Sequence, residues 1–221
     1  LSEITLALFE DSGWYRARYF TGGLFRYGKK ATCVFFENNC IVDSYPLYYN
    51  EFCIFDGSGM CNPNRLERGI CHMNIQKSSS TGNTFIPEQY QYFQDPYIGG
   101  FPLVDFCPIS VAFEGRESYL AGSCDLGESV FPIGMLDTIS PQSGCFMSSL
   151  ASIGNKVIRP FVNTWNPLCY KFKCNFEKKT YSLILDNSNS VEVPFEGGSI
   201  EVSGFVGTVE APNFALICTN K

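Results

Sequence analysis

The sequence predicts an α+β fold: a short N-terminal helix, then a mainly antiparallel β domain that is rich in loops and stapled by disulfides. Three observations predict it. The first residues form an apolar, helix-prone segment. From Tyr15 onward, short β-prone runs alternate with Gly, Pro, Asn and Ser. Eleven cysteines are spread over 221 residues that contain a single histidine.

A short helix is expected over residues 2–12, SEITLALFEDS. Ser2 is a good N-cap, Glu3 suits the first turn, and Gly13 is a suitable stop. The apolar residues are Ile4, Leu6, Ala7, Leu8 and Phe9. They surround the helix instead of forming one stripe, which predicts burial on most sides. Because about three turns of helix are not stable alone, the segment is expected to belong to a larger domain.

Short strands are expected in the rest of the chain. The candidate runs are Thr32–Phe36, Tyr45–Tyr49, Val104–Phe106, Ser110–Phe113, Tyr170–Phe172, Tyr181–Leu185, Val191–Val193, Ser199–Val202 and Phe214–Cys218. Tyr181–Leu185 and Val191–Val193 flank the turn-forming residues Asp186–Ser190, which predicts a hairpin. Ser199–Val202 followed by Gly204–Val209 predicts further antiparallel pairing.

The cysteine content predicts disulfides and an oxidising compartment. No C-x-x-C pair occurs, which disfavours a reduced protein with metal-binding cysteines. Since eleven is odd, either one thiol is free or its partner lies outside this chain.

The charge balance is acidic, with a formal net charge of −6 and a pI of about 4.9. Lysines and arginines are dispersed, and Lys29–Lys30 and Lys178–Lys179 are the only adjacent basic pairs. We therefore expect no nucleic-acid partner. No apolar run of about 20 residues occurs, so no membrane span is expected. No secretory signal precedes the helix, which predicts that an N-terminal portion is missing from the sequence.

Catalytic and metal-binding residues are not expected in this chain. His72 is the only histidine, whereas a catalytic zinc site needs three protein ligands and an open position for water. Cys71 and His72 beside Cys61 are considered as a zinc site, but a disulfide cysteine followed by a loop histidine is favoured. Ser58, between Gly57 and Gly59, indicates a turn, because the G-x-S-x-G pattern of a nucleophile elbow is not matched.

Two further groups have alternative interpretations. The acidic residues considered as calcium ligands are Asp43, Glu51, Asp56 and Asp105. No EF-hand loop pattern is present, so solvated or structural roles are expected. The aromatic residues near them are Tyr45, Tyr48, Tyr49, Phe52 and Phe55. A core is expected there, with an exposed binding surface as the alternative.

Six segments in order resemble the leishmanolysin family. They are SEITLALFEDSGWYRARY (2–19), ATCVFFENNC (31–40), CNPNRLERGIC (61–71) with Cys53 before it, YFQDPYIGGFPLVDFCP (92–108), CYKFKC (169–174) and FEGGSIEVSGFVG (195–207). The first is similar to the family segment that follows the Met-turn, and the last to its P-E-G-G-x-I-x-V-x-G-F-x-G signature. The resemblance spans essentially the whole chain, and its strength lies in the order and compatible spacing of the six segments.

The resemblance implies that the chain is the C-terminal part of a zinc metalloendopeptidase. The H-E-x-x-H helix, the third histidine and the Met-turn of the family lie upstream of Leu1, so zinc belongs to the full-length protein and this chain alone is expected to be inactive. Residues 1–38 would complete the catalytic module, and residues 39–221 would form the family's C-terminal β domain.

Partners and location follow from the same resemblance. The expected partners are the missing N-terminal catalytic portion and either peptide or protein substrates or surface proteins. An extracellular or cell-surface location is expected, by secretion or lipid anchoring, with roles in proteolysis and cell adhesion. The alternative is a non-catalytic adhesion, binding or structural module derived from the family, and degenerate zinc ligands upstream would distinguish it.

The family pattern also implies the disulfide pairing. The pairs are Cys40–Cys107, Cys53–Cys71, Cys61–Cys145, Cys124–Cys169 and Cys174–Cys218, with Cys33 pairing to a cysteine upstream of Leu1. Val193 and Ala211 replace a further family pair, so we expect them to lie close in space. Each bridge contributes about 2–5 kcal/mol, against about 5–15 kcal/mol for a whole domain. The five bridges are therefore expected to decide whether the region folds.

Overall fold

The computed structural model describes residues 3–18, 28, 32–48, 51–75, 85–112, 122–125, 137–152, 166–185 and 189–218. Its helical elements are α1 (Glu3–Asp11), α2 (Val34–Glu37), α3 (Phe214–Ile217) and the 3-10 turns η2 (Glu88–Tyr90) and η3 (Pro102–Val104). Every strand pair among these residues is antiparallel. The predicted α+β class, with mostly antiparallel β structure, few short helices and five disulfides, is confirmed.

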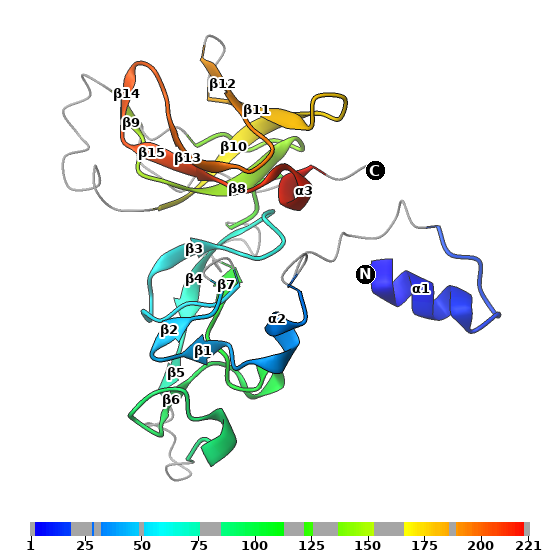
Figure 1. The fold of residues 1–221 in the computed structure, drawn as a ribbon, viewed down its shortest axis with the longest axis vertical. Helices are drawn as coiled ribbons and strands as arrows, with labels where there is room; N and C mark the ends of the chain where they lie inside the picture. The colour runs from blue at the N-terminus through cyan, green and yellow to red at the C-terminus, as the bar shows by residue number, and fades with distance from the viewer. Residues whose placement is uncertain are drawn as a thin grey trace.

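The larger unit is a six-stranded sheet built from the C-terminal half of the chain (Figure 1). In spatial order its strands are β12 (Ser190–Val193), β11 (Thr180–Ile184), β10 (Asn166–Asn175), β8 (Ser143–Ser148), β15 (Thr208–Ala211) and β13 (Gly198–Glu201). A small pair, β9 (Ala151–Ser152) with β14 (Phe205–Val206), lies beside it. We call this the sheet unit.

The sheet unit has its own hydrophobic core. Alternate residues of the central strands point into it, and Phe146, Leu168, Tyr170 and Tyr181 are fully buried. The core closes against α3, whose Phe214 and Ile217 are buried. Val193 and Ala211, expected to be neighbours, are both buried members of this same cluster.

The smaller unit contains three short strand groups below the sheet in Figure 1. They are β1 (Ile41–Val42) with β2 (Tyr45–Pro46), β3 (Gly59–Cys61) with β4 (Arg68–His72) and β7 (Ile109–Ala112), and β5 (Asn74–Ile75) with β6 (Ile98–Gly99). We call this the cystine unit, because its own two buried clusters contain half-cystines. A third cluster, shared with β8 and β10 of the sheet unit, has only half-cystines as its buried residues.

Several sequence predictions are confirmed. The helix ends as expected at Gly13, which adopts a left-handed φ of 73° and donates its N–H to the Glu10 carbonyl. The predicted hairpin is formed by β11 and β12, although part of its turn lies outside the described residues. The second predicted pairing is confirmed in part: β13 pairs with β15, of which Thr208 and Val209 belong to the predicted run, whereas Phe205 and Val206 form β14 and pair with β9. Ser2, the expected N-cap, also lies outside the described residues.

Three predicted strands are wrong, because the structure forms helices or turns there. Thr32–Phe36 contains most of α2, and Phe214–Cys218 contains α3. Val104 ends the 3-10 turn η3, and Asp105 and Phe106 after it have left-handed φ angles. Apolar runs this short carry no clear period, so end signals decide the conformation. Pro102 starts η3, and the side chain of Asn213 caps α3 by accepting a hydrogen bond from the Leu216 N–H at 3.1 Å.

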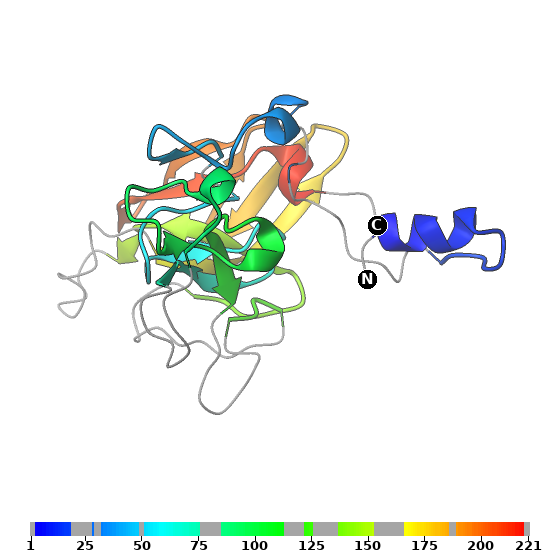
Figure 2. The same cartoon turned by 90° about the horizontal axis from the view of Figure 1, so that it is seen from below.

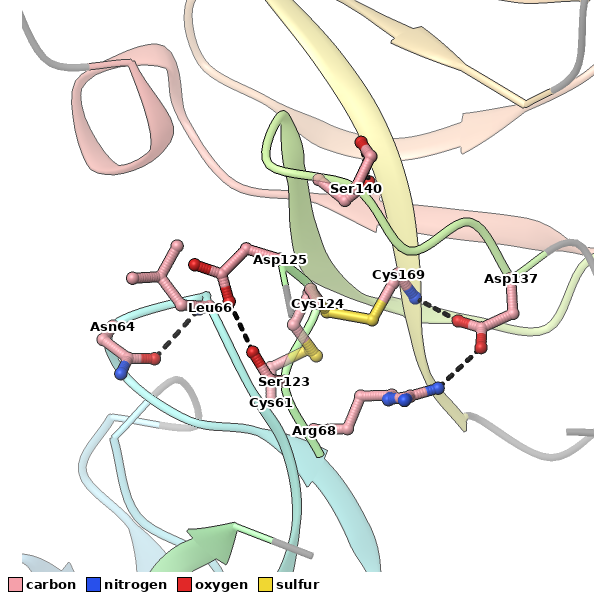
Figure 3. Close-up of a disulfide and its surroundings, with 12 residues drawn as sticks. Cys61, Asn64, Leu66, Arg68, Ser123, Cys124, Asp125, Asp137, Ser140 and Cys169 are labelled. Atoms are coloured by element: carbon pink, nitrogen blue, oxygen red, sulfur yellow. Dashed lines mark hydrogen bonds and ion pairs between the residues drawn. A yellow bond between two sulfur atoms is a disulfide. The ribbon is translucent and has the colours of Figure 1, made fainter. Parts of the chain in front are cut away.

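Two cystines join the cystine unit to the sheet unit (Figure 3). Cys61 of β3 is bonded to Cys145 of β8, and Cys124 is bonded to Cys169 of β10. Cys145 and Cys169 lie directly opposite each other across β8 and β10. Both cross-links therefore end at one point of the sheet, and we call this point the junction.

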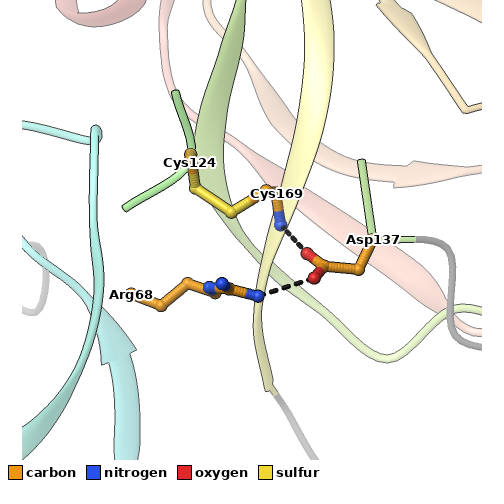
Figure 4. Close-up of polar contacts among 4 residues, drawn as sticks. All are labelled: Arg68, Cys124, Asp137 and Cys169. Carbon is orange, nitrogen blue, oxygen red and sulfur yellow. Dashed lines mark hydrogen bonds and ion pairs between the residues drawn. A yellow bond between two sulfur atoms is a disulfide. The ribbon is translucent and has the colours of Figure 1, made fainter. Parts of the chain in front are cut away.

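A buried ion pair lies at the junction (Figure 4). Nη1 of Arg68 lies 2.6 Å from Oδ2 of Asp137, and both side chains are fully shielded from solvent. Oδ1 of Asp137 accepts a hydrogen bond from the Cys169 N–H at 2.8 Å. Burial lowers the pKa of Arg68, and the charge of Asp137 opposes this shift. Asp137 thus links β4, which carries Arg68, to β10.

Glu51 is a second buried acid, with 7% of its surface exposed. Its Oε1 accepts a hydrogen bond from the Gly28 N–H at 3.2 Å, whereas Oε2 has no hydrogen-bond partner among the described residues. Burial raises the pKa of Glu51 above its ordinary value, and the Gly28 hydrogen bond and the charge of Arg65 oppose the shift.

We predict that Asp137→Asn lowers the free energy of unfolding by about 3–5 kcal/mol, because it leaves the Arg68 charge buried without its partner. Asparagine keeps an oxygen that can accept a hydrogen bond from the Cys169 N–H. The loss of stability therefore measures the effect of leaving the Arg68 charge unpaired. The control is Arg68→Met combined with Asp137→Asn, which buries no charge and should recover much of the loss. Denaturant unfolding of the oxidised chain measures both, and equal stability of wild type and Asp137→Asn would contradict the assignment.

We predict that Glu51→Gln makes the protein more stable than wild type at pH 7. A carboxyl whose folded pKa is raised stabilises the fold below its unfolded pKa, and this contribution is lost as pH rises through the folded pKa. The advantage of glutamine should therefore shrink toward zero near pH 4. Unfolding of both proteins across this range tests it, with the exposed Glu88→Gln as control. An advantage that does not change with pH would refute the prediction.

Candidate functional site: an unpaired cysteine and exposed apolar helices

The cysteines expected to form five pairs are joined in the structure as Cys40–Cys107, Cys53–Cys71, Cys61–Cys145, Cys124–Cys169 and Cys174–Cys218. Cys33 remains, with an exposed thiol. It lies at the N-terminal end of α2, where its carbonyl accepts the N–H groups of Phe36 and Glu37. The thiol is therefore positioned at the surface by the first turn of a helix.

Exposed apolar side chains flank this thiol on α2. Phe36 is 83% exposed, and Val34 is also exposed. Phe35, between them, points inward, where its ring stacks on Phe52 at a centroid distance of 5.8 Å. The inward ring anchors the helix to the cystine unit, so its two neighbours face solvent. Burying such apolar surface is favourable, which makes this face suitable for contact with another polypeptide.

The helix α1 is exposed as well, contrary to the burial that its sequence predicts. Leu8 is 69% exposed, Ile4 and Phe9 are exposed, and only Leu6 among its described side chains is buried. Just beyond the helix, Trp14 is 85% exposed. Figures 1 and 2 both show α1 to one side of the two β units. No described part of the chain covers the surface that the helix needs to bury. We call α1, Trp14 and the exposed face of α2 the N-terminal apolar surface.

The residues considered as a zinc site, Cys61, Cys71 and His72, do not form one. Among the residues that the structure describes, no group of three or more His, Cys, Asp or Glu side chains could hold a metal ion. His72 stacks on Phe101 with ring centroids 4.6 Å apart, and its neighbour Cys71 is in a disulfide. Cys61, the other cysteine considered, is also in a disulfide. Neither sulfur is available as a thiolate ligand.

The remaining candidates have structural roles. Oγ of Ser58 donates to the carbonyl of Phe55 at 2.7 Å within a turn, as the flanking glycines predict. Oδ1 of Asp56 accepts the N–H of Met73 at 2.9 Å. Asp43 and Asp105 adopt left-handed backbone conformations, with φ of 51° and 53°. These acids and Glu51 lie in separate turns of the chain.

The aromatic group near the acids divides between core and surface. Phe52 is buried and stacks on Phe35, which also packs against Tyr48. Tyr45 and Phe55 are exposed. Tyr49 lies outside the described residues. The expectation of a core therefore holds for part of this group only.

The sequence patterns considered above did not reveal one cluster of lysines. Lys171, Lys173, Lys178 and Lys179 all lie on the hairpin of β10 and β11. The segment KFKCNFEKK carries them within nine residues, and counting lysines over a short window, instead of only adjacent pairs, would have found them.

Comparisons with known proteins extend over the whole chain. The family model described as "Leishmanolysin" matches residues 1–221. The chain is 25% identical over 227 residues to "Leishmanolysin" of Leishmania donovani, which covers 98% of this chain and 36% of that protein. It is 29% identical over 232 residues to "Leishmanolysin homolog" of Crithidia fasciculata, covering 100% of this chain and 33% of that protein.

The chain thus spans about a third of the length of the curated relatives it matches. No helix in the described ranges is long and apolar enough to cross a membrane. The order of the six sequence motifs, the antiparallel fold with its five disulfides, and a family match over every residue agree. The chain belongs to the leishmanolysin family.

Proposed function

We propose that this chain is the C-terminal part of a leishmanolysin-type zinc metalloendopeptidase, where it supports a catalytic portion that it does not itself contain. The observation that carries the proposal is the combination of a family match over the whole chain with coverage of only a third of the relatives. The zinc ligands and the catalytic residues would lie in the part of the full-length protein that this chain does not cover.

The N-terminal apolar surface supports this arrangement. A helix with Ile4, Leu8 and Phe9 exposed is not stable alone, so it needs a further apolar surface to pack against. We propose that this surface belongs to the catalytic portion and that α1 packs beneath the zinc site. Residues 1–38 would then complete the catalytic module, and residues 39–221 would form the C-terminal domain.

Cys33 would cross-link the two portions. Its thiol is exposed beside Val34 and Phe36, on a face suited to contact with another polypeptide. A disulfide from Cys33 to an upstream cysteine would hold the catalytic portion on this face. The cystine content favours an oxidising compartment, and we propose that the full-length protein acts on peptides or proteins outside the cell or at its surface.

The test compares the 221-residue chain with the full-length protein. We expect the full-length protein to bind one zinc ion per chain and to hydrolyse peptides, and the 221-residue chain to do neither. Alkylation without reduction, read by intact mass, should label the isolated chain once, at Cys33. Disulfide mapping of the full-length protein should find Cys33 bonded to an upstream cysteine.

Two outcomes would count against separate parts of the proposal. A full-length protein without zinc and without peptidase activity would contradict the enzymatic role. A free Cys33 in the full-length protein, or labelling of several cysteines in the isolated chain, would contradict the cross-link.

A further inference from the structure

The β10–β11 hairpin carries a concentration of positive charge on an acidic protein. The nine residues from Lys171 to Lys179 contain four lysines and one carboxylate, Glu177, whereas the whole chain has a formal net charge of −6. No other lysine lies in the described part of the chain. We call Lys171, Lys173, Lys178 and Lys179 the lysine track.

Two lysines of the track stand on one face of an inner strand. Phe172 and Cys174 pack against the core of the sheet unit, so Lys171 and Lys173, which alternate with them, point away from it. Their Cα atoms are about 6.6 Å apart along the strand. The residues opposite them are uncharged: Ser143 and Ile184 beside Lys171, and Ser182 beside Lys173.

The other two lysines lie in the turn, which is rigidly held. The backbone N–H of Lys178 donates to Oδ1 of Asn175 at 3.1 Å, and Lys179 has a left-handed φ of 54°. Phe176 packs edge-on against Phe214 of α3, with ring centroids 5.6 Å apart. The Cys174–Cys218 disulfide ties the end of β10 to the end of α3. The lysines are therefore presented by a fixed backbone.

The positive charges of the track are not neutralised by the described residues. None of the four lysines forms an ion pair with them. Glu192, the single carboxylate of β12, accepts a hydrogen bond from Oγ1 of Thr180 at 2.7 Å. Lysine ammonium groups without an ion-pair partner attract anions. The net negative charge of the rest of the chain repels anions from its other surfaces.

We propose that the lysine track binds a sulfated polysaccharide. Its charges begin with Lys171 and Lys173, about 6.6 Å apart along β10, and continue with Lys178 and Lys179 in the turn, which matches a linear polyanion with repeated sulfate groups. A lipid bilayer fits less well, because Lys171 and Lys173 stand on the face of an inner strand of the sheet. Sulfated polysaccharides also occur in the oxidising, extracellular environment that the cystines indicate.

The test measures binding of a fluorescent, heparin-derived oligosaccharide to the oxidised 221-residue chain near physiological salt. Lys178→Gln with Lys179→Gln should raise the Kd roughly three- to thirtyfold, because two exposed charge contacts are lost. Lys29→Gln with Lys30→Gln is the matched control, since it removes the same charge from the chain's other adjacent lysine pair. It should change the Kd by less than about twofold, through net charge alone.

Each of the following outcomes would overturn the proposal. Equal weakening by the two double variants would mean that net charge, and not the lysine track, governs binding. Equal binding of a desulfated oligosaccharide would exclude recognition of sulfate. Binding only to vesicles of phosphatidylcholine and phosphatidylserine would assign the track to a membrane surface, and no binding to either probe would leave it without a polyanionic partner. Circular dichroism of each variant establishes that a lost signal is not unfolding.

Discussion

The two β units are held together by covalent cross-links that meet at the junction. Cys145 and Cys169 are opposite each other on β8 and β10, and each is bonded to a cysteine outside the sheet. The bond from Cys61 to Cys145 spans 84 residues of sequence, and closing a loop of that length in the unfolded chain stabilises the fold by about 4–5 kcal/mol in the chain-entropy model.

The sheet unit has an apolar core of its own, whereas the buried clusters of the cystine unit are built around half-cystines. The cystine unit and the α2 face that it supports therefore depend on the disulfides.

The disulfide cross-links hold in place the surfaces on which the proposed roles depend. The part of the N-terminal apolar surface that lies on α2 is anchored to the cystine unit by the stacking of Phe35 on Phe52. The lysine track lies on the sheet unit, where Cys174–Cys218 holds its turn. A body fixed by cystines can thus present one surface toward a catalytic portion and another toward an external ligand. The disulfides hold the backbone of the cystine unit next to α2 and the turn of the lysine track, and side chains on a fixed backbone lose little entropy on binding.

Sequence reasoning predicted the parts of the fold that have clear local signals. Two β-prone runs on either side of the turn-forming residues Asp186–Ser190 identified the β11–β12 hairpin, and Gly13 marked the end of α1. The disulfide pairing came from the family resemblance, because eleven cysteines admit many pairings that spacing alone does not distinguish. Short apolar runs such as Phe214–Cys218 were wrongly predicted as strands, since a single cap such as Asn213 decides them. The ion pair of Arg68 with Asp137 joins residues 69 positions apart, and no local pattern indicates it.

Backbone hydrogen exchange after complete reduction of the disulfides tests most directly whether covalent cross-links hold the cystine unit in its fold. The prediction is that the reduced chain loses its cooperative melting transition and that the amides of β3, β4 and β7 exchange as fast as in an unfolded chain. A reduced chain that still melts cooperatively, with β4 as protected as in the oxidised protein, would contradict the dependence of this fold on its cystines.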